Sequence, residues 1–448
     1  MQADLEAVTA ELLAAARRAG ADSADAIAVA GEHLSIEVRA GALEQAERAE
    51  GIDVGLRVLI GQRQACVSAS DHSPRTIEEM AERAVAMARE APEDPWCGLA
   101  APEELARDWD LAALDLADPA PAPDPADLET AAREAEAAAR AVSGVTQMDS
   151  AGASWQRSRV HLAMTNGFSG GYGRTGAAVH AVAITGEGTG MERDWAVESR
   201  TYRDELPDAA EIGRLAGERT VARAGAGKPP TGAWPVIFDE RASGSLIGHL
   251  TQAVNGSSVA RGASWLQDAM GEQVLPEGID LIEDPTRSRI SGSRPFDAEG
   301  LPVARRAIVE NGVLKGWTLD LATARKLGLK STGSASRGPG GPPSPSTGNL
   351  WLTHGQRDRA ALMAEMGEGL LITSLIGSSI NPTTGDYSRG ASGFWVRGGE
   401  IVRPVNECTI AGNLRDMLRT IRPANDGRAH LSRVVPSLLV EGLTIAGD

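Results

Sequence analysis

The sequence has few cysteines, and none of them lie close together. Cys66, Cys97 and Cys408 are the three cysteines in 448 residues. This spacing excludes both a disulfide framework and a Cys-x-x-Cys metal knuckle. Unpaired thiols suit a reducing compartment, so we expect a cytoplasmic protein. Cys408 has no histidine nearby in the sequence, and we interpret it as a small core residue rather than a nucleophile.

Long apolar runs and positive charge are also scarce. The sequence has no stretch of about 18 apolar residues without charges, so no membrane span is expected. Residues 1–20 mix charged and apolar positions, which predicts an amphipathic helix rather than an export signal. The formal net charge of -17 repels phosphate backbones. We therefore expect no nucleic-acid partner.

Closely spaced histidines are missing as well. The sequence has seven histidines, and no two lie within a few residues of each other. Zinc hydrolases commonly carry two histidines on one element, because both imidazoles must reach the same ion. A metal site here would have to combine distant residues such as His249, His354 and His430. The chain also lacks a Gly-x-Ser-x-Gly elbow, and its glycine-rich runs lack the lysine of a phosphate-binding loop.

What the sequence does contain is typical of a folded α+β protein. Apolar residues make up 42% and charged residues 23% of the chain, as in globular domains. A length of 448 residues predicts two domains. The turn-rich segment 225–232 precedes an apolar strand, so we expect domains at 1–228 and 229–448.

We predict that the N-terminal domain has helices packed on an antiparallel sheet. Apolar spacing and helix-stop residues predict helices at 5–18, 75–90, 126–142 and 209–224. Short alternating segments predict strands at 25–29, 34–40, 52–60 and 65–69, and further strands are expected at 145–150, 154–166 and 175–185. We expect breaks between the first four of these strands at Gly31, Gly41, Gly51 and Gly61.

We predict a mainly antiparallel β domain for the C-terminal half. Asn311-Gly312 and Gly398-Gly399 each lie between two strand-like segments, and they suit the positive φ angles of tight hairpin turns. The segment from Ser334 to Asn349 is dense in Gly, Pro and Ser. We interpret it as a flexible linker, with a substrate-facing loop as the alternative.

The densest group of polar residues lies between 381 and 394. Its candidate functional residues are Asn381, Asp386, Ser388 and Arg389. In one interpretation they satisfy the backbone of their own turns, and Arg389 pairs with a carboxylate. In the other they bind an extended peptide. The residues alone leave both interpretations open.

Long motifs in the same half of the chain resemble a known family. They are Asn-Pro-Thr-Thr-Gly-Asp-Tyr-Ser-Arg-Gly-Ala-Ser-Gly-Phe-Trp at 381–395, Thr-Ile-Ala-Gly-Asn-Leu at 409–414 and Pro-Ser-Leu-Leu-Val-Glu-Gly-Leu-Thr-Ile-Ala-Gly at 436–447. Shorter ones are Phe-Asp-Ala-Glu-Gly-Leu-Pro at 296–302 and Lys-Ser-Thr-Gly-Ser-Ala-Ser-Arg at 330–337. With these motifs the chain resembles the TldE (PmbA) branch of the TldD/PmbA metalloprotease family over nearly its whole length.

The resemblance implies a heteromeric complex that cleaves or trims unfolded peptides. In such a complex a TldD-type subunit holds zinc through a His-Glu-x-x-x-His motif and a cysteine, and a TldE-type subunit completes the assembly. Aligned with that motif, the two histidine ligands correspond to Gly248 and Ala253, and His249 takes the place of the glutamate. The cysteine has no counterpart in the region 427–435. We therefore expect no catalytic residue and no metal in this chain, with zinc in the partner subunit.

The resulting hypothesis is a TldE-like pseudoenzyme subunit of a zinc metalloprotease complex. Its expected partners are a TldD-type catalytic subunit and unfolded peptides, with a homodimer as a possible form of the chain alone. Whether this chain is itself an enzyme stays open. One alternative is an autonomous metallopeptidase with a non-standard site built from His249, His354 or His430. The other is a non-enzymatic peptide-binding scaffold that forms a homodimer.

Overall fold

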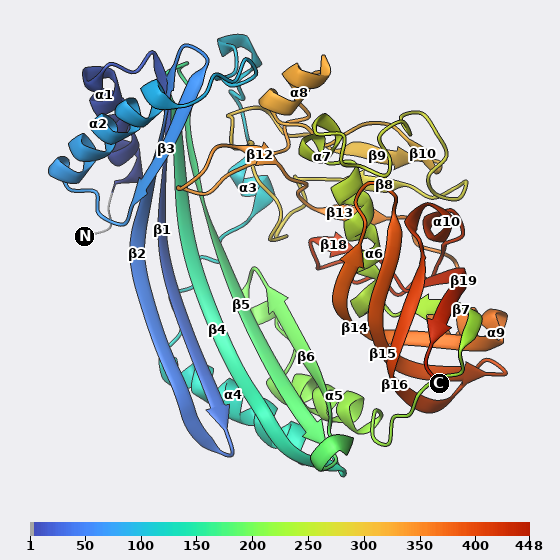
Figure 1. Cartoon of the computed structure of the whole chain (residues 1–448). Coiled ribbons are helices and arrows are strands. Elements are labelled where there is room, and N and C mark those ends of the chain that lie inside the picture. The colour runs from blue at the N-terminus through green and yellow to red at the C-terminus, as the bar shows by residue number, and fades with distance from the viewer. Residues whose placement is uncertain (1–3) are drawn as a thin grey trace.

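The N-terminal half of the chain forms one long antiparallel sheet. A computed structural model describes residues 4–448. The strand order is β3-β2-β1-β4-β5-β6, and Figure 1 shows these strands as a tall, curved layer. The strands are β1 (Ser23–Arg39), β2 (Ala42–Ile60), β3 (Arg63–Ala69), β4 (Val145–Met164), β5 (Ser169–Thr185) and β6 (Glu192–Arg200).

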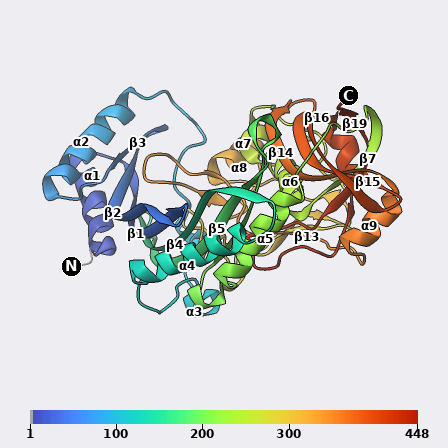
Figure 2. The same cartoon turned by 90° about the horizontal axis from the view of Figure 1, so that it is seen from below.

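Four helices cover one face of this sheet, two at each end (Figures 1 and 2). The helices are α1 (Leu5–Ala19), α2 (Pro74–Glu90), α4 (Pro125–Arg140) and α5 (Ala209–Val221), and the short α3 (Leu111–Leu114) lies between α2 and α4. Ala26 of β1 packs against helices α1 and α2, and Ile36 of the same strand packs against helices α4 and α5. Both are even-numbered, and alternate residues of a strand share one face. The predicted arrangement of helices on an antiparallel sheet is therefore confirmed.

Two glycines that we expected to separate strands instead lie inside them. Gly31 of β1 pairs directly with Gly51 of β2, and on its other side Gly31 pairs with Ser158 of β4. Backbone pairing with both neighbours keeps the strand extended at Gly31 without help from a side chain. The turn occurs at Ala40 and Gly41, whose φ angles are 53° and 77°. The predicted breaks at Gly31 and Gly51 are therefore wrong, whereas those at Gly41 and Gly61 are confirmed.

The C-terminal half is built around a closed barrel. Strand β14 pairs with β15 and, in parallel, with β7. Strand β16 pairs with both β15 and β19, and β19 pairs with β7, so the ring closes. Closure removes exposed strand edges. The strands are β7 (Gly232–Phe238), β14 (Glu368–Ile380), β15 (Asp386–Arg397), β16 (Glu400–Asn413) and β19 (Leu438–Ala446), with β17 (Arg422–Pro423) paired to β19.

A smaller five-stranded sheet lies beside the barrel, with the order β10-β9-β8-β13-β18. Its strands are β8 (Leu281–Glu283), β9 (Arg306–Glu310), β10 (Val313–Leu314), β13 (Leu350–Leu352) and β18 (Arg433–Val434). Asn311-Gly312 joins β9 to β10, and Gly398-Gly399 joins β15 to β16. All four turn residues have positive φ angles, which confirms both predicted hairpins.

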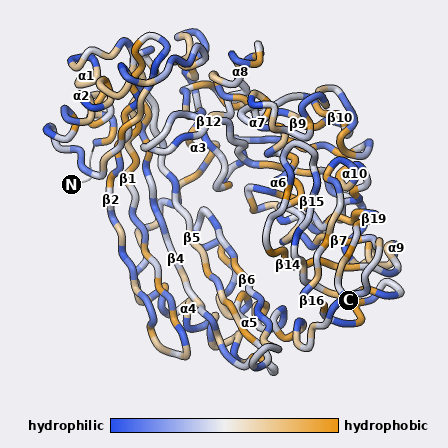
Figure 3. The backbone as a smooth tube through the Cα atoms, viewed as in Figure 1, coloured by the Kyte–Doolittle hydropathy of each residue, from blue (hydrophilic) through white to orange (hydrophobic). Residues whose placement is uncertain are grey.

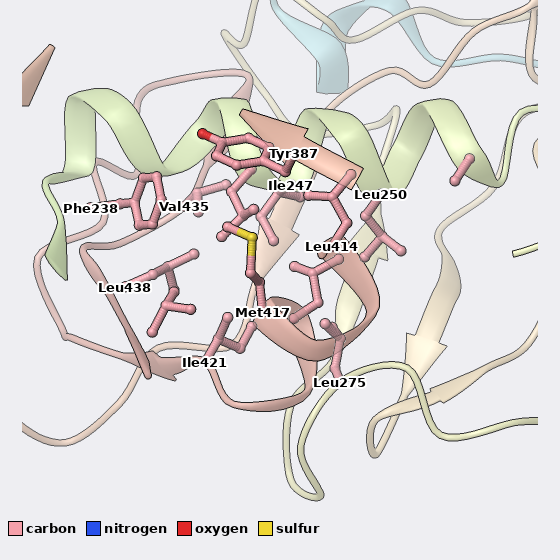
Figure 4. Close-up of a cluster of buried hydrophobic side chains, with 14 of the residues drawn as sticks. Phe238, Ile247, Leu250, Leu275, Tyr387, Leu414, Met417, Ile421, Val435 and Leu438 are labelled. Carbon is pink, nitrogen blue, oxygen red and sulfur yellow. The ribbon is translucent and has the colours of Figure 1, made fainter. Parts of the chain in front are cut away.

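Four of the five C-terminal helices contribute to one apolar cluster, and the fifth, α9 (Arg359–Met366), packs on the other face of the barrel strands. Figure 4 shows Ile247 and Leu250 of one helix packed with Leu414 and Met417 of another, beneath the ring of Tyr387. This cluster is the largest apolar core of the described chain. The four helices of the cluster are α6 (Glu240–Ala253), α7 (Gly256–Ala260), α8 (Leu321–Leu327) and α10 (Leu414–Arg419). The predicted β-rich C-terminal part is confirmed.

The segment 334–349 is not a flexible linker. It forms a two-stranded ribbon, β11 (Ala335–Ser336) with β12 (Ser344–Pro345), whose tip reaches the N-terminal sheet. The buried Arg337 side chain forms an ion pair with buried Asp25 of β1. A Cβ atom on Gly55 of β2 would lie 2.2 Å from the Pro339 carbonyl oxygen. The linker interpretation is wrong because a buried charge pair and close backbone packing fix this segment.

Hydropathy changes along the strands. Figure 3 shows β2 as mainly hydrophilic in its lower half and hydrophobic next to α1 and α2. Residues 42–51 are exposed, whereas Val54 to Leu59 are buried. Within residues 4–448, no helix combines the length and the apolar character that a membrane crossing needs.

Candidate functional site

Helix α6 carries Gly248, His249 and Ala253, the positions that the sequence resemblance aligns with a metal-binding motif. It follows β7 directly and begins after Asp239, whose side chain accepts a hydrogen bond of 3.1 Å from the Arg241 backbone nitrogen. Ile247 packs into the barrel core, whereas Gly244 and Gly248 are only half-buried. A Cβ atom on Gly244 would meet no heavy atom within 4 Å. One side of α6 therefore faces open space.

The two positions aligned with the histidine ligands lie in different surroundings. A Cβ atom on Gly248 would lie 3.7 Å from Nη1 of Arg433. Ala253 is 4% exposed and belongs to the apolar core. Zinc ligands must converge on one ion, and neither position carries a donor atom. Among residues 4–448 no group of three or more His, Cys, Asp or Glu side chains is arranged to hold a metal, so the residues present do not fit the zinc site that the resemblance implies.

His249 lies in place of the catalytic glutamate and is a neutral, half-buried side chain. Its ring centroid is 5.8 Å from that of Tyr387. Burial lowers the pKa of His249, and the nearby charge of Arg389 lowers it further. Burial also raises the pKa of Tyr387 to about 12. The surroundings of His249 and Tyr387 therefore favour the uncharged form of both side chains.

The other two candidate histidines lie elsewhere. The ring of His354 stacks on Trp351 at 4.6 Å between centroids. Nε2 of His430 is 3.3 Å from a carboxylate oxygen of Glu198 in β6. Burial is the main reason that the pKa of each histidine is lowered. The structure does not bring His249, His354 and His430 together.

Cys408 is a core residue, as predicted. It is 5% exposed, and its sulfur donates a hydrogen bond of 3.2 Å to the Ala391 carbonyl. Burial raises the pKa of this thiol to about 11. A thiol that stays protonated at neutral pH is a poor nucleophile.

The predicted polar residues lie at the connection between β14 and β15 and at the start of β15. Oδ1 of Asn381 accepts hydrogen bonds from the backbone nitrogens of residues 383 and 384, at 2.9 and 3.2 Å. Asp386 accepts bonds from Thr384 and Asn413, which lower its pKa. Ser388 pairs within the barrel sheet. Hydrogen bonds within the local turns thus use much of the capacity of the Asn381 and Asp386 side chains. Peptide binding by the four candidate residues stays a prediction.

Arg389 differs from the expectation. Its Nε donates a hydrogen bond of 2.7 Å to the carbonyl of Gly377. Within residues 4–448 it makes no ion pair with a carboxylate. The expected carboxylate partner is therefore wrong, because β14 offers a backbone acceptor at the adjacent turn.

A cleft that sequence reasoning missed lies between the two halves of the chain. It has a volume of about 670 Å³ and is lined on one side by β1, β4, β5 and β6. Loops at 288–291 and 430–432 line the other side. Among the β5 residues that line this cleft, Arg174 and Gly176 are half-buried, whereas Thr175 and Ala177 are buried. That alternation was the available signal, but β5 was expected to begin only at residue 175.

The acidic strand β6 holds the two halves together next to this cleft. Asp194 forms an ion pair of 2.8 Å with Arg241 at the start of α6. Glu198 pairs with Arg428, and Glu192 accepts a hydrogen bond from Asn406. These three acidic residues alternate with outward-pointing ones, so they share one face of β6. Three polar contacts of β6 therefore connect the two halves of the chain.

Comparisons with known proteins agree with this architecture. Three family models match the chain: PmbA/TldA metallopeptidase domain 1 at residues 24–88, the central domain at 118–224 and the C-terminal domain at 231–447. The chain is also 36% identical over 418 residues to Metalloprotease PmbA of Escherichia coli O157:H7, and the matched region covers 93% of this chain and 90% of that protein. The chain belongs to the PmbA/TldD metallopeptidase family.

Other members of the PmbA/TldD family show graded similarity. A PmbA homolog from Haemophilus influenzae is 32% identical over 435 residues, covering 97% of this chain and 94% of the relative. A TldD homolog from Buchnera aphidicola is 26% identical over 238 residues, covering 48% of this chain and 49% of the relative. The chain thus matches the PmbA-named relatives over a longer span than this TldD-named one.

Solved structures share the whole fold. A protein from Bacteroides thetaiotaomicron, described as a candidate modulator of DNA gyrase, superposes with a TM-score of 0.90 at 25% identity, and the match covers 100% of both chains. TldE from Thermococcus kodakarensis superposes with a TM-score of 0.83 at 19% identity, covering 98% of this chain and 100% of that one. The second match shows the fold alone.

Proposed function

We propose that this chain is the TldE-type, non-catalytic subunit of a heteromeric metalloprotease complex that cleaves or trims unfolded peptides. In this proposal a TldD-type partner holds the zinc and performs the hydrolysis. The observation that carries the proposal is the state of helix α6. Gly248 and Ala253 have no donor atoms and face different surroundings, so this chain offers the metal no pair of convergent ligands.

The role of this chain in the complex is to bind the peptide and to support the partner's active site. Residues at the exposed end of the β14–β15 hairpin are the candidate peptide contacts, namely Asn381, Asp386, Ser388 and Arg389. We test them by replacing Asp386 and Arg389 with alanine in the reconstituted complex. We expect weaker peptide cleavage with intact assembly. Unchanged cleavage and unchanged assembly would remove these residues from the proposal.

We also propose a reducing, cytoplasmic location. Cys66, Cys97 and Cys408 are all free thiols, and such thiols persist in reducing compartments. The location is tested by fractionating cells and probing each fraction with an antibody against the chain. Recovery of the protein from an oxidising compartment would contradict it.

The decisive experiment measures zinc and peptidase activity for the chain alone and with a TldD-type partner. We expect no bound zinc and no peptide cleavage for the chain alone. Both should arise in the complex, and both should be lost when the histidines of the partner's His-Glu-x-x-x-His motif are replaced. Stoichiometric zinc together with chelator-sensitive cleavage by the chain alone would overturn the proposal in favour of an autonomous metallopeptidase.

A third outcome is a stable homodimer that binds peptides, carries no zinc and forms no complex with the TldD-type protein. That result would replace the proposal with a non-enzymatic scaffold. Size-exclusion chromatography with light scattering separates it from the heteromeric assembly.

A further inference from the structure

Arginines outnumber carboxylates among the residues that line the cleft, although the whole chain is acidic. The formal net charge of the chain is -17. The ionisable residues that line the cleft are nevertheless mainly basic: His33, Arg174, Arg200, Arg289, His430 and a single acid, Glu205. A recessed site of one sign attracts ligands of the other sign. The lining therefore favours an anionic ligand.

Two of the three arginines already have carboxylate partners. Arg200 lies 2.8 Å from an oxygen of Glu198, and Arg289 lies 2.6 Å from an oxygen of Asp115. Arg289 also pairs with Glu205. These two charges are balanced within the protein, so neither is available as the main partner of a ligand.

Arg174 is the exception. Its guanidinium donates to the carbonyl oxygens of Ser291 and Ser293, at 2.7 and 3.1 Å, and to the Tyr172 hydroxyl at 3.2 Å. All three acceptors are neutral, and among residues 4–448 no carboxylate forms an ion pair with Arg174. A guanidinium carries five N–H donors, so donors remain after these contacts. The charge is half-buried, uncompensated and held in place over the Tyr172 ring at 5.2 Å.

The surface next to Arg174 can accept an extended chain. Gln156 of β4 is exposed, lines the cleft and pairs with Gly176, two residues along β5 from Arg174. Residues two apart in a strand point to the same face, so Arg174 and Gly176 lie side by side on the floor of the cleft. Gly176 has no side chain to block the floor, and the Gln156 amide can both donate and accept hydrogen bonds. Ser154, on the same face of β4, adds a hydroxyl.

We propose that this cleft binds a carboxylate of an extended peptide, with Arg174 as its charged partner and Gln156 as an adjacent amide contact. The inference rests on the proposed function in supplying peptides as the ligand class. It adds the chemistry that the cleft recognises, which is a carboxylate at a chain end or on an acidic side chain. Guanidinium and carboxylate form paired charge-assisted hydrogen bonds, and these are stronger than neutral ones.

The test uses the full chain and four fluorescently labelled unstructured peptides of otherwise equal sequence. One has a free C-terminal carboxylate and one a C-terminal amide. The third has the amide and an internal glutamate, and the fourth has the amide and a glutamine at the same place. Binding is measured by fluorescence anisotropy. We expect carboxylate-bearing peptides to bind about tenfold more tightly than their neutral counterparts, which corresponds to one charge-assisted contact.

The third peptide distinguishes the two sources of the carboxylate. Tight binding of the free-acid peptide alone assigns the cleft to a peptide C-terminus. Tight binding of the glutamate peptide as well assigns it to carboxylates in general. Equal binding of all four peptides, or no binding of any, overturns the inference, and this comparison needs no variant.

Arg174→Gln supplies the second line of the test. We expect it to abolish the preference for carboxylates, so that acidic and neutral peptides bind equally. Arg174→Lys should keep part of the preference, because it retains the charge without the fork geometry. Arg157→Gln is the matched control. The Arg157 guanidinium also lies over an aromatic ring, that of Trp155, and donates a hydrogen bond to a carbonyl. Arg157 pairs with Thr175, however, so it lies on the opposite face of the sheet from Arg174.

An Arg174→Gln chain that keeps the full preference refutes the site even if peptides bind. The proposed function fails separately, if the chain alone carries zinc and cleaves these peptides. The two failures are therefore distinguishable in one set of samples.

Discussion

Replacing Asp25 with asparagine tests whether a buried charge cluster joins the two halves of the chain. Asp25 is 0% exposed. One of its oxygens lies 2.5 Å from Nε of Arg57, and the other pairs with Arg337 of the β11–β12 ribbon. One carboxylate thus balances two guanidiniums, and burial lowers the pKa of Arg337 to about 10. The cluster can remain charged inside the fold only while Asp25 is ionised.

The expected cost follows from this geometry. Removing one partner of a buried ion pair leaves an uncompensated charge and costs about 3–5 kcal/mol. Asp25→Asn leaves two guanidiniums, so we expect a loss in the free energy of unfolding of at least about 3 kcal/mol. Native domains have only about 5–15 kcal/mol in total. Urea unfolding followed by tryptophan fluorescence measures this loss.

Glu78→Gln is the control, because Glu78 pairs with Arg18 on the surface and both side chains are about half exposed. Such a pair contributes about 0–1 kcal/mol. If Asp25→Asn costs no more than Glu78→Gln, the buried cluster does not join the halves as argued. Replacing Asp25, Arg57 and Arg337 together with Leu, Met and Met should cost much less than Asp25→Asn alone, since no charge is then left buried.

Three further predictions follow from close packing and buried titratable groups. Gly55→Ala should push the β11–β12 ribbon away from β2, lower the free energy of unfolding by about 1–3 kcal/mol and speed tryptic cleavage after Arg337. Gly31→Ala is the control, because its Cβ would meet nothing within 4 Å, and it should have neither effect. Equal cleavage rates for the two variants would contradict the close contact. Burial and the nearby Asp297 raise the pKa of Glu299 in the folded state. A group with a raised folded-state pKa stabilises the fold at low pH, and that stability is lost as the pH rises through the folded-state pKa. In urea unfolding between pH 5 and 8, the wild type should therefore lose stability relative to Glu299→Gln, and parallel stability curves for the two proteins would contradict this prediction. With a pKa of about 11, Cys408 should be the last cysteine alkylated by iodoacetamide at pH 8 in peptide mass spectra, and early modification would show that it is not buried.

Local sequence signals predicted elements well where neighbours in the chain decide the structure. The four main helices begin after side chains that cap them, and the turns at Asn311-Gly312 and Gly398-Gly399 adopt the positive φ angles that these residues tolerate. Tertiary pairing decided the rest. Gly31 is compatible with a turn in isolation, but strands on both sides fix it as extended. Closure of the barrel between β16 and β19, and the parallel pairing of β7 with β14, join segments too distant for any local pattern to reveal.

The same distinction applies to the site. The absence of donors at Gly248 and Ala253 is a property of the sequence and could be predicted from it. The different surroundings of the two positions depend on how α6 packs and could not. The cleft around Arg174 forms from strands and loops separated by more than 100 residues, so no motif marks it. Arg337 was assigned to a flexible segment because Gly, Pro and Ser suggest mobility, whereas its single buried charge pair outweighs that composition.

The contact between Arg337 and Asp25 also sets an order of events during synthesis. The two residues are 312 positions apart, and the N-terminal strand leaves the ribosome first. At about 5–20 residues per second, translation takes roughly 15–60 s to produce the arginine after the aspartate. During that interval β1 and β2 exist with Arg57 as the only guanidinium of the cluster. The N-terminal sheet therefore completes its buried charge cluster only after residues 229–337, about half of the C-terminal half, have been translated. A nascent chain that stalls before residue 337 cannot complete it.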